Sequence, residues 1–226
     1  DDDPNGTDAN APPLSEREFV CMNDEYSECR TGQYSKDLSR KVISDHFGRN
    51  KACTREVSCW PLFCRKHYQR ATYNADKWQL RKINLILRQF DVIESEHPGT
   101  TYNVCLKKSE EGRLNKFSRG IASGLSSEDA GAPVLPSNNK SFEAPIDVLR
   151  ELEFGLGEKK TIDEVKATVT TILDMLNKGE TKAVPSIEFL PQLPKKNAAP
   201  VTPKNKNKGT PTRVSAKGSV KKTTKK

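Results

Sequence analysis

The cysteine and histidine side chains that could bind a metal ion are concentrated in one stretch of this 226-residue chain. All six cysteines and all three histidines lie between Cys21 and Cys105. Cys64 and His67 are the most informative pair, because two ligands three positions apart on a helix project from one face, as two corners of a tetrahedral Zn²⁺ site require. Cys53, just before Cys59, could supply a third ligand.

The fourth ligand would be Cys21 or Cys29. The spacing Cys53-x5-Cys59-x4-Cys64-x2-His67 matches no common zinc finger. Three interpretations of the cysteines therefore stay open, namely a structural zinc ion, buried free thiols and disulfide bonds. Disulfides would accompany secretion, and the tripeptides at 5–7 and 139–141 have the form of glycosylation acceptors.

Cys64 and His67 resemble a catalytic nucleophile and its base only in composition. Two side chains one turn apart on a helix rarely reach the required geometry, which also needs a third, orienting group. The sequence has no glycine-rich phosphate loop, no paired catalytic carboxylates and no serine elbow. We therefore expect a protein that is not an enzyme.

The charged side chains are distributed in blocks. Lysine and arginine outnumber acidic residues by 19 to 9 over residues 30–120 and by 11 to 0 over residues 195–226. The other two blocks are acidic, with a net charge of −8 over residues 1–29 and of −5 over residues 121–194. Two basic blocks in one chain favour a polyanionic partner over a small metabolite. The lysine-rich end also predicts a nuclear location.

Nucleic-acid contacts are expected from two groups of basic and amide side chains. Arginine, asparagine and glutamine can form paired hydrogen bonds with base edges, and lysine suits phosphates. The candidates are Arg49, Asn50, Lys51, Arg55, Arg65, Lys66, Gln69 and Arg70. A helix with this face beside a turn fits a reader of the major groove in duplex DNA. Trp60, Tyr68 and Trp78 could instead stack on bases, which favours RNA or single strands.

Apolar spacing and cap residues predict a mainly α-helical domain. Helices are expected over 35–47, 61–73, 76–93 and 109–118, and alternation predicts a strand over 100–106 that could form part of a wing. We therefore expect a small helical domain of the helix-turn-helix or winged-helix-like kind, stapled by zinc if the metal interpretation holds.

Composition divides the chain into five segments. We expect a disordered acidic segment at 1–18, the basic Cys/His domain at 19–120, a linker at 121–144, an αα-hairpin at 145–180 and a disordered, lysine-rich tail at 181–226. Thr161 and Glu164 form a capping box that starts the second helix of the hairpin. This hairpin is too small to be stable alone, so it is expected to pack on the domain, self-associate or bind a protein. The sequence contains no apolar run of membrane-spanning length.

Several segments together resemble a family of little-characterised proteins from filamentous fungi. They are Gly48–Lys51, Trp60–Arg70, Pro98–Tyr102 and Leu106–Glu111. Family members are labelled by similarity to a factor linked with host penetration by plant pathogens. The resemblance implies an intracellular, nuclear fungal protein and carries over no catalytic residue.

The sequence thus predicts a nuclear DNA-binding protein, a transcription or chromatin factor. Three alternatives stay open. They are an RNA- or single-strand-binding protein, a secreted disulfide-bonded effector that binds a host protein, and an adaptor whose basic blocks only direct it to the nucleus.

Overall fold

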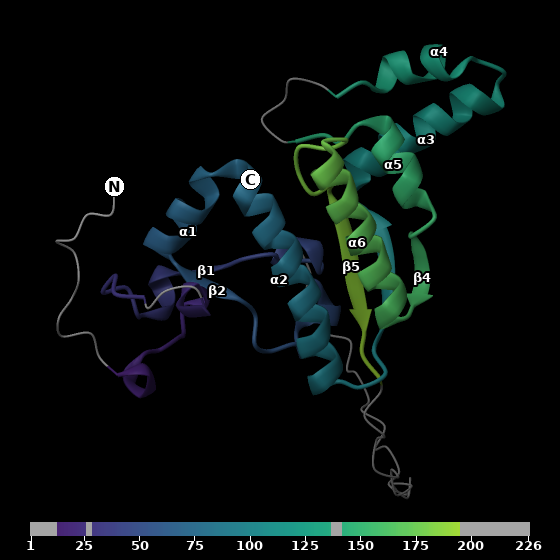
Figure 1. The fold of residues 1–226 in the computed structure, drawn as a ribbon. Coiled ribbons are helices and arrows are strands. Elements are labelled where there is room, and N and C mark those ends of the chain that lie inside the picture. Colours follow the sequence, from purple (N-terminus) through teal and green to yellow (C-terminus); the bar gives the residue numbers. More distant parts are fainter. Residues whose placement is uncertain (1–12, 26–28, 137–141, 195–226) are drawn as a thin grey trace, which may run out of the picture. The chain divides into compact units, whose positions relative to one another are not determined.

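The computed structural model describes residues 13–25, 29–136 and 142–194 (Figure 1). The described residues belong to the first of two units, Asp1–Pro194, and the second unit, Lys195–Lys226, lies outside them. The predicted disorder of residues 1–12 and 195–226 therefore also falls outside the described residues. Within these residues the fold is mixed α/β, with six α-helices and two antiparallel sheets. The expected mainly α fold of the helix-turn-helix or winged-helix-like kind is wrong.

The first sheet is a two-stranded hairpin of β1, Ser39–Lys41, and β2, Leu62–Cys64, with Arg40 opposite Phe63. Short 3-10 helices precede and follow β1, and their bounds are Leu14–Glu16, Met22–Glu25, Lys36–Leu38, Ser44–His46 and Ala52–Thr54.

The helix expected over 35–47 is absent. Val42, Ile43 and Phe47 are buried as its apolar spacing requires, but an extended strand and a turn bury them instead. Ile43 has a left-handed φ of 56°, and the Val42 N–H bonds to the Pro61 carbonyl, which extends the hairpin. A left-handed φ is unfavourable for a β-branched residue, so burial of the Ile43 side chain and the surrounding contacts must hold this turn.

Two helices follow β2 with one residue between them. α1 spans Arg65–Tyr73 and α2 spans Ala75–Glu96. The helix predicted over 76–93 is confirmed. The helix predicted from Pro61 begins four residues later, because Leu62–Cys64 pairs with β1. Asn74 caps α2 by accepting a hydrogen bond from the Lys77 N–H at 3.1 Å.

The second sheet has the order β4-β3-β5, with β3 at Thr101–Leu106, β4 at Gly157–Lys160 and β5 at Ile187–Gln192. The strand expected over 100–106 is confirmed, but it is the centre of this sheet rather than part of a wing. Val104 lies opposite Phe189, and both are buried. β4 comes from the segment expected to be an αα-hairpin, and β5 comes from the segment expected to be a disordered tail.

Four helices accompany this sheet, namely α3 at Lys108–Ala122, α4 at Ser127–Gly131, α5 at Ile146–Glu153 and α6 at Ile162–Lys178. A 3-10 helix, Ala132–Val134, follows α4, so part of the expected linker is folded. The capping box of Thr161 and Glu164 is confirmed at the start of α6.

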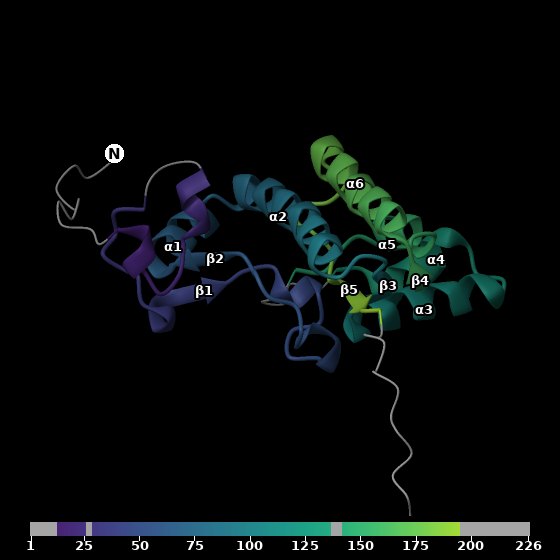
Figure 2. The same ribbon diagram turned by 90° about the horizontal axis from the view of Figure 1, so that it is seen from below.

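α2 and α6 lie side by side over one face of the second sheet (Figures 1 and 2). Phe90 of α2 is fully buried between them and the strands. Its ring centroid lies 5.2 Å from those of Tyr102 and Phe189 and 5.3 Å from that of Phe47. One apolar core therefore joins the N-terminal hairpin region to the sheet. Among the helices of the described segments, none has the length and apolar character needed to cross a bilayer.

Candidate metal centre

Four buried side chains gather where β2 meets α1. They are Cys21, Cys29, Cys64 and His67, and their possible ligand atoms all lie within 4.8 Å of one another. These residues are 0–8% exposed. Soft thiolate sulfur and imidazole nitrogen are the donors that Zn²⁺ accepts in structural sites, so the chemistry of the set fits a metal ion.

The chain positions these ligands through the hairpin and the first turn of α1. Cys64 ends β2 and is the N-cap of α1, and His67 lies in that first turn. Cys21 immediately precedes the 3-10 helix Met22–Glu25, which contacts β2. The carbonyl of Cys29 accepts a hydrogen bond from the Tyr34 hydroxyl at 3.0 Å.

The distances between ligand atoms match a tetrahedral site. Zn²⁺ bonds of about 2.3 Å to sulfur and about 2.05 Å to nitrogen place two sulfurs about 3.8 Å apart, and a sulfur and a nitrogen about 3.5 Å apart. The Sγ atoms of Cys29 and Cys64 are 3.8 Å apart, and Cys21 Sγ is 3.5 Å from His67 Nδ1. These two distances are those of a tetrahedral site, and all four ligand atoms lie within 4.8 Å of one another, so the cluster could hold a metal ion.

Hydrogen-bond donors surround the sulfur atoms. The backbone N–H of Cys64 donates to Cys21 Sγ, and that of His67 donates to Cys64 Sγ, each at 3.3 Å. The Thr31 hydroxyl lies 3.3 Å from the sulfurs of both Cys29 and Cys64. Such donors orient metal ligands and stabilise thiolate charge.

The hydrogen bonds among the three thiols shift their pKa values in different directions. Hydrogen bonding with Cys29 and Cys64 raises the pKa of the Cys21 thiol, and the hydrogen bond from Cys21 lowers the pKa of the Cys29 and Cys64 thiols below its usual range. The thiolate form is thus easier to reach at Cys29 and Cys64 than at Cys21. A bound cation is what would allow all three to be thiolates together.

The other cysteines predicted as ligands lie elsewhere. Cys53 is half-buried in the 3-10 helix Ala52–Thr54, and Cys59 is exposed beside Ser58. All six cysteines are free thiols. The sequence named all four clustered residues, but it placed Cys53 third and only one of Cys21 and Cys29 fourth, whereas the fold brings both Cys21 and Cys29 to the cluster and leaves Cys53 outside it. The close approach of Cys21 and Cys29 to Cys64 is a property of the fold, and spacing along the chain does not reveal it.

The candidate nucleic-acid residues fall into two places. Arg65, Lys66, Gln69 and Arg70 are exposed on α1, directly beside the metal centre. The Lys66 N–H donates to the Gln33 side chain at 3.0 Å, which further holds the start of this helix.

The second group lies next to β5. Arg49, Asn50, Lys51 and Arg55 are exposed in the segment around the 3-10 helix Ala52–Thr54, which contacts β5. Lys51 forms a 2.6 Å ion pair with Glu188 of that strand. The helix-and-turn arrangement expected to unite both groups is therefore absent, and α1 is the helix that displays a basic face.

The aromatic residues considered for base stacking are used in packing. Trp78 makes edge contacts with Phe63 and Tyr68 at 6.2 and 6.0 Å between ring centroids, and Trp60 contacts Phe47 at 5.6 Å. Tyr73, at the end of α1, is instead 92% exposed. Its place after the basic residues was visible in the sequence, but its exposure was not.

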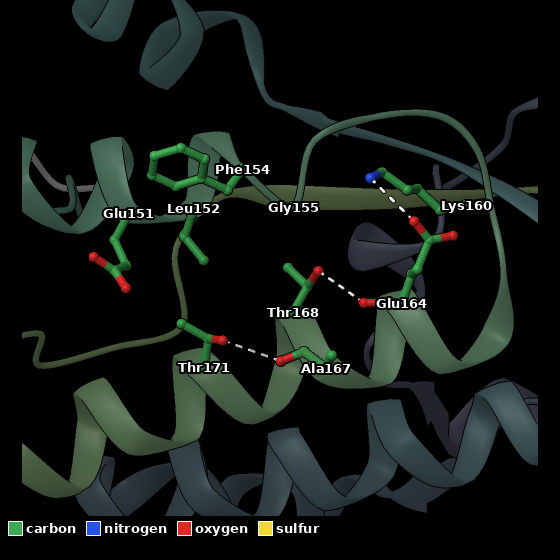
Figure 3. A pocket seen from close by; sticks show the side chains of 9 residues that line it. All are labelled: Glu151, Leu152, Phe154, Gly155, Lys160, Glu164, Ala167, Thr168 and Thr171. Carbon is green, nitrogen blue, oxygen red and sulfur yellow. Dashed lines mark hydrogen bonds and ion pairs between the residues drawn. The ribbon is translucent and has the colours of Figure 1, made fainter.

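A separate hollow lies between α5 and α6 (Figure 3). Lys160 and Glu164 form an ion pair at its edge, and the Thr168 hydroxyl donates to the Glu164 carbonyl at 3.0 Å. Phe154, which is 87% exposed, lies at its rim. The polar groups that line this hollow mainly form hydrogen bonds and an ion pair that cap α6 or bond to its own backbone.

Comparisons with protein families, with curated proteins and with solved structures gave no match to this chain. The resemblance to the filamentous-fungal family therefore stays a prediction.

Proposed function

We propose that this chain is a nuclear, non-enzymatic nucleic-acid-binding protein whose binding surface is the exposed face of α1. A structural zinc ion would fix that helix against the β1–β2 hairpin. The observation that carries the proposal is that the N-cap of α1, Cys64, and His67 in its first turn are two of the four clustered residues, while the exposed side of the helix is basic.

Zinc is the metal that suits the cluster. Three thiolates and one imidazole at tetrahedral distances form a Cys₃His set, and protein ligands take all four positions. A catalytic zinc ion needs an open position for water or substrate. The metal would therefore stabilise the fold and leave binding to the surface that it supports.

The surface has the side chains that a polyanion requires. Arg65, Lys66 and Arg70 are exposed on one helix, and the surrounding range 30–120 has a net charge of +10. Neutralising phosphates releases condensed counterions, which provides sequence-independent affinity. Gln69 lies among these cations and can bond to a base edge. The lysine-rich range 195–226 would add affinity and direct the protein to the nucleus.

The sequence favours duplex DNA as the ligand, and the dimensions of α1 permit it. α1 is about 13 Å long at about 1.5 Å per residue, and an α-helix with a diameter of about 10–12 Å including side chains can enter a major groove about 12 Å wide. Structured RNA and single strands are compared with duplex DNA in the same assay.

The test is a binding titration of the full-length zinc-loaded protein with fluorescent oligonucleotides. The variant carries Arg65→Glu, Lys66→Glu and Arg70→Glu. Its matched control carries Lys108→Glu, Lys116→Glu and Arg119→Glu, the same charge change on exposed positions of α3. We expect the α1 variant to lose at least about 100-fold in affinity and the α3 variant to lose far less. Equal losses in the two variants would overturn the proposal.

A further inference from the structure

We propose that α1 binds an unpaired nucleobase, stacked on the ring of Tyr73, so that the ligand is single-stranded nucleic acid. This inference rests on the proposed function and, among nucleic acids, favours single strands over the duplex DNA that the sequence predicts. The site is a shallow hollow lined by Lys66, Gln69, Arg70 and Tyr73.

Tyr73 stands apart from the neighbouring aromatic rings. Tyr68 and Trp78 pack edge-on against each other, and Lys41 lies over the ring of Trp60 with 4.0 Å from its Nζ atom to the centroid. Tyr34 lies under the guanidinium of Arg17 in the same way, at 4.2 Å. Tyr73 is 92% exposed, so both faces of its ring are open to a planar ligand.

The backbone at Tyr73 is held in a defined place. α1 ends at Tyr73 and α2 begins at Ala75, so no flexible loop lies beside it. Asn74 between them caps α2, and the Thr72 hydroxyl bonds to the carbonyls of Tyr68 and Gln69 at 3.0 and 3.1 Å. Because this backbone is fixed before binding, binding has to order only the side chain of Tyr73.

The neighbouring side chains complement a nucleotide. Lys66, Arg70 and Tyr73 are spaced by four and three positions, so they line one stripe of the helix, with Gln69 beside them. The two cations can contact the phosphates on either side of a stacked base, and the Gln69 amide can donate to and accept from its edge.

An open aromatic face selects against paired bases. In a duplex each base face is covered by its neighbours, so Tyr73 cannot reach it without unstacking, which costs a few kcal/mol per base step. In a single strand every base has a free face, and stacking on an aromatic ring is tolerant of sequence. We therefore expect modest base preference and a clear preference for single strands.

The experiment compares Tyr73→Ala and Tyr73→Phe with the unmodified full-length protein. The probes are a fluorescent 12-nucleotide oligothymidylate and a mixed-sequence 12-base-pair duplex at one ionic strength. Phe154→Ala is the matched control, because Phe154 is also exposed but is the C-cap residue of α5. Far-ultraviolet circular dichroism verifies that each variant is folded.

We expect Tyr73→Ala to weaken single-strand binding by roughly 5- to 150-fold, as the loss of one stacked base does. Tyr73→Phe, which keeps the ring, should stay within about twofold, and duplex binding should change little. Phe154→Ala should leave both affinities unchanged.

The results separate this inference from the proposed function. If the charge-reversed α1 variant loses binding but Tyr73→Ala does not, base stacking is excluded and the binding surface stands. If Tyr73→Ala loses equal affinity for the duplex and for the single strand, base stacking is also excluded. If neither variant affects binding, both proposals fail.

Discussion

The backbone N–H of His67 donates a hydrogen bond of 3.3 Å to the Sγ atom of Cys64, within the first turn of α1. The two residues that form the N-cap hydrogen bond of α1 are therefore also two of the four candidate metal ligands. A metal ion bound there would fix both the start of α1 and the direction of its exposed face.

Replacing Cys64 with serine should remove the metal while keeping the helix cap, because serine is itself a good N-cap. We expect Cys64→Ser to lose bound zinc and more than about 3 kcal/mol of unfolding free energy, since structural zinc binding contributes about 10–16 kcal/mol in small peptides. Metal stoichiometry and denaturant unfolding measure both effects.

The control is Cys59→Ser, because Cys59 is exposed and lies outside the cluster. It should keep its zinc and its stability. Full zinc content in Cys64→Ser, or disulfide bonds among these cysteines in the purified protein, would contradict the metal assignment.

His46 should make the fold sensitive to mild acid. The His46 side chain is 3% exposed, and its Nδ1 atom lies 3.0 Å from the Ile187 carbonyl oxygen. The charged groups that affect its pKa are Asp45, Lys82 and Lys107. Burial is the main cause that lowers its pKa from 6.5 to about 4.

The unfolded chain therefore takes up a proton below pH 6.5 while the folded chain does not. Neutral His46 therefore makes its full contribution to the free energy of unfolding above pH 6.5. As the pH falls toward 4, this free energy decreases by about 1.4 kcal/mol per pH unit. Urea unfolding of the unmodified protein and of His46→Gln at several pH values isolates this effect as the difference between the two. Parallel pH profiles would show that His46 does not titrate in this way.

Glu110 and Arg113 should contribute far more stability than a similar pair on the surface. The Glu110 side chain is 1% exposed. Its carboxylate accepts a hydrogen bond from Arg113 Nη1 at 2.6 Å and another from the Ala144 N–H at 3.0 Å. These bonds connect α3 to the segment just before α5. Glu110→Ala leaves a partly buried guanidinium without this partner, and we expect a loss of about 3–5 kcal/mol.

Asp147 and Arg150 provide the comparison. They have the same three-residue spacing, but they are 3.5 Å apart and well exposed. Asp147→Ala should cost less than about 1 kcal/mol in the same unfolding measurement. Equal costs for the two substitutions would show that burial does not determine the strength of the inner pair.

Gly155 allows the chain after α5 to pass close to α6 (Figure 3). A Cβ atom at this position would lie 2.6 Å from Thr168 Oγ1 and 2.9 Å from Thr168 Cγ2. We expect Gly155→Ala to destabilise the fold by about 1–3 kcal/mol, because the side chain of Thr168 or the backbone must shift.

Gly131→Ala is the matched change, since a Cβ atom there meets nothing within 4 Å. It should be neutral or slightly stabilising at the end of α4. Thermal unfolding compares the two variants, and a neutral Gly155→Ala would refute the predicted clash.

Local patterns in the sequence predicted the elements that depend on local interactions. The apolar stripe of α2, the alternation in β3 and the capping box at Thr161 all correspond to observed elements. The helix predicted over 35–47 failed because the spacing of Val42, Ile43 and Phe47 fits a helix face as well as it fits burial by a strand and a turn. Long-range contacts made that choice.

The same limit applies to the site. Cys64 and His67 were paired correctly because their spacing is local. Cys21 joins them through the hydrogen bond between its sulfur and the Cys64 N–H, across 43 positions of the chain. The exposure of Tyr73 likewise depends on how α1 and α2 meet, which no local pattern encodes.

The salt dependence of binding tests most directly whether α1 is the surface that contacts nucleic acid. Each phosphate contact contributes a slope of about −0.9 on duplex DNA, or about −0.7 on a single strand, to a plot of log affinity against log salt concentration. For the full-length zinc-loaded protein, reversing Arg65, Lys66 and Arg70 should make that slope shallower by about 2–3, and reversing the three cations of α3 should leave it unchanged. An unchanged slope in the α1 variant, together with loss of binding only when residues 195–226 are removed, would contradict the account and assign binding to the tail.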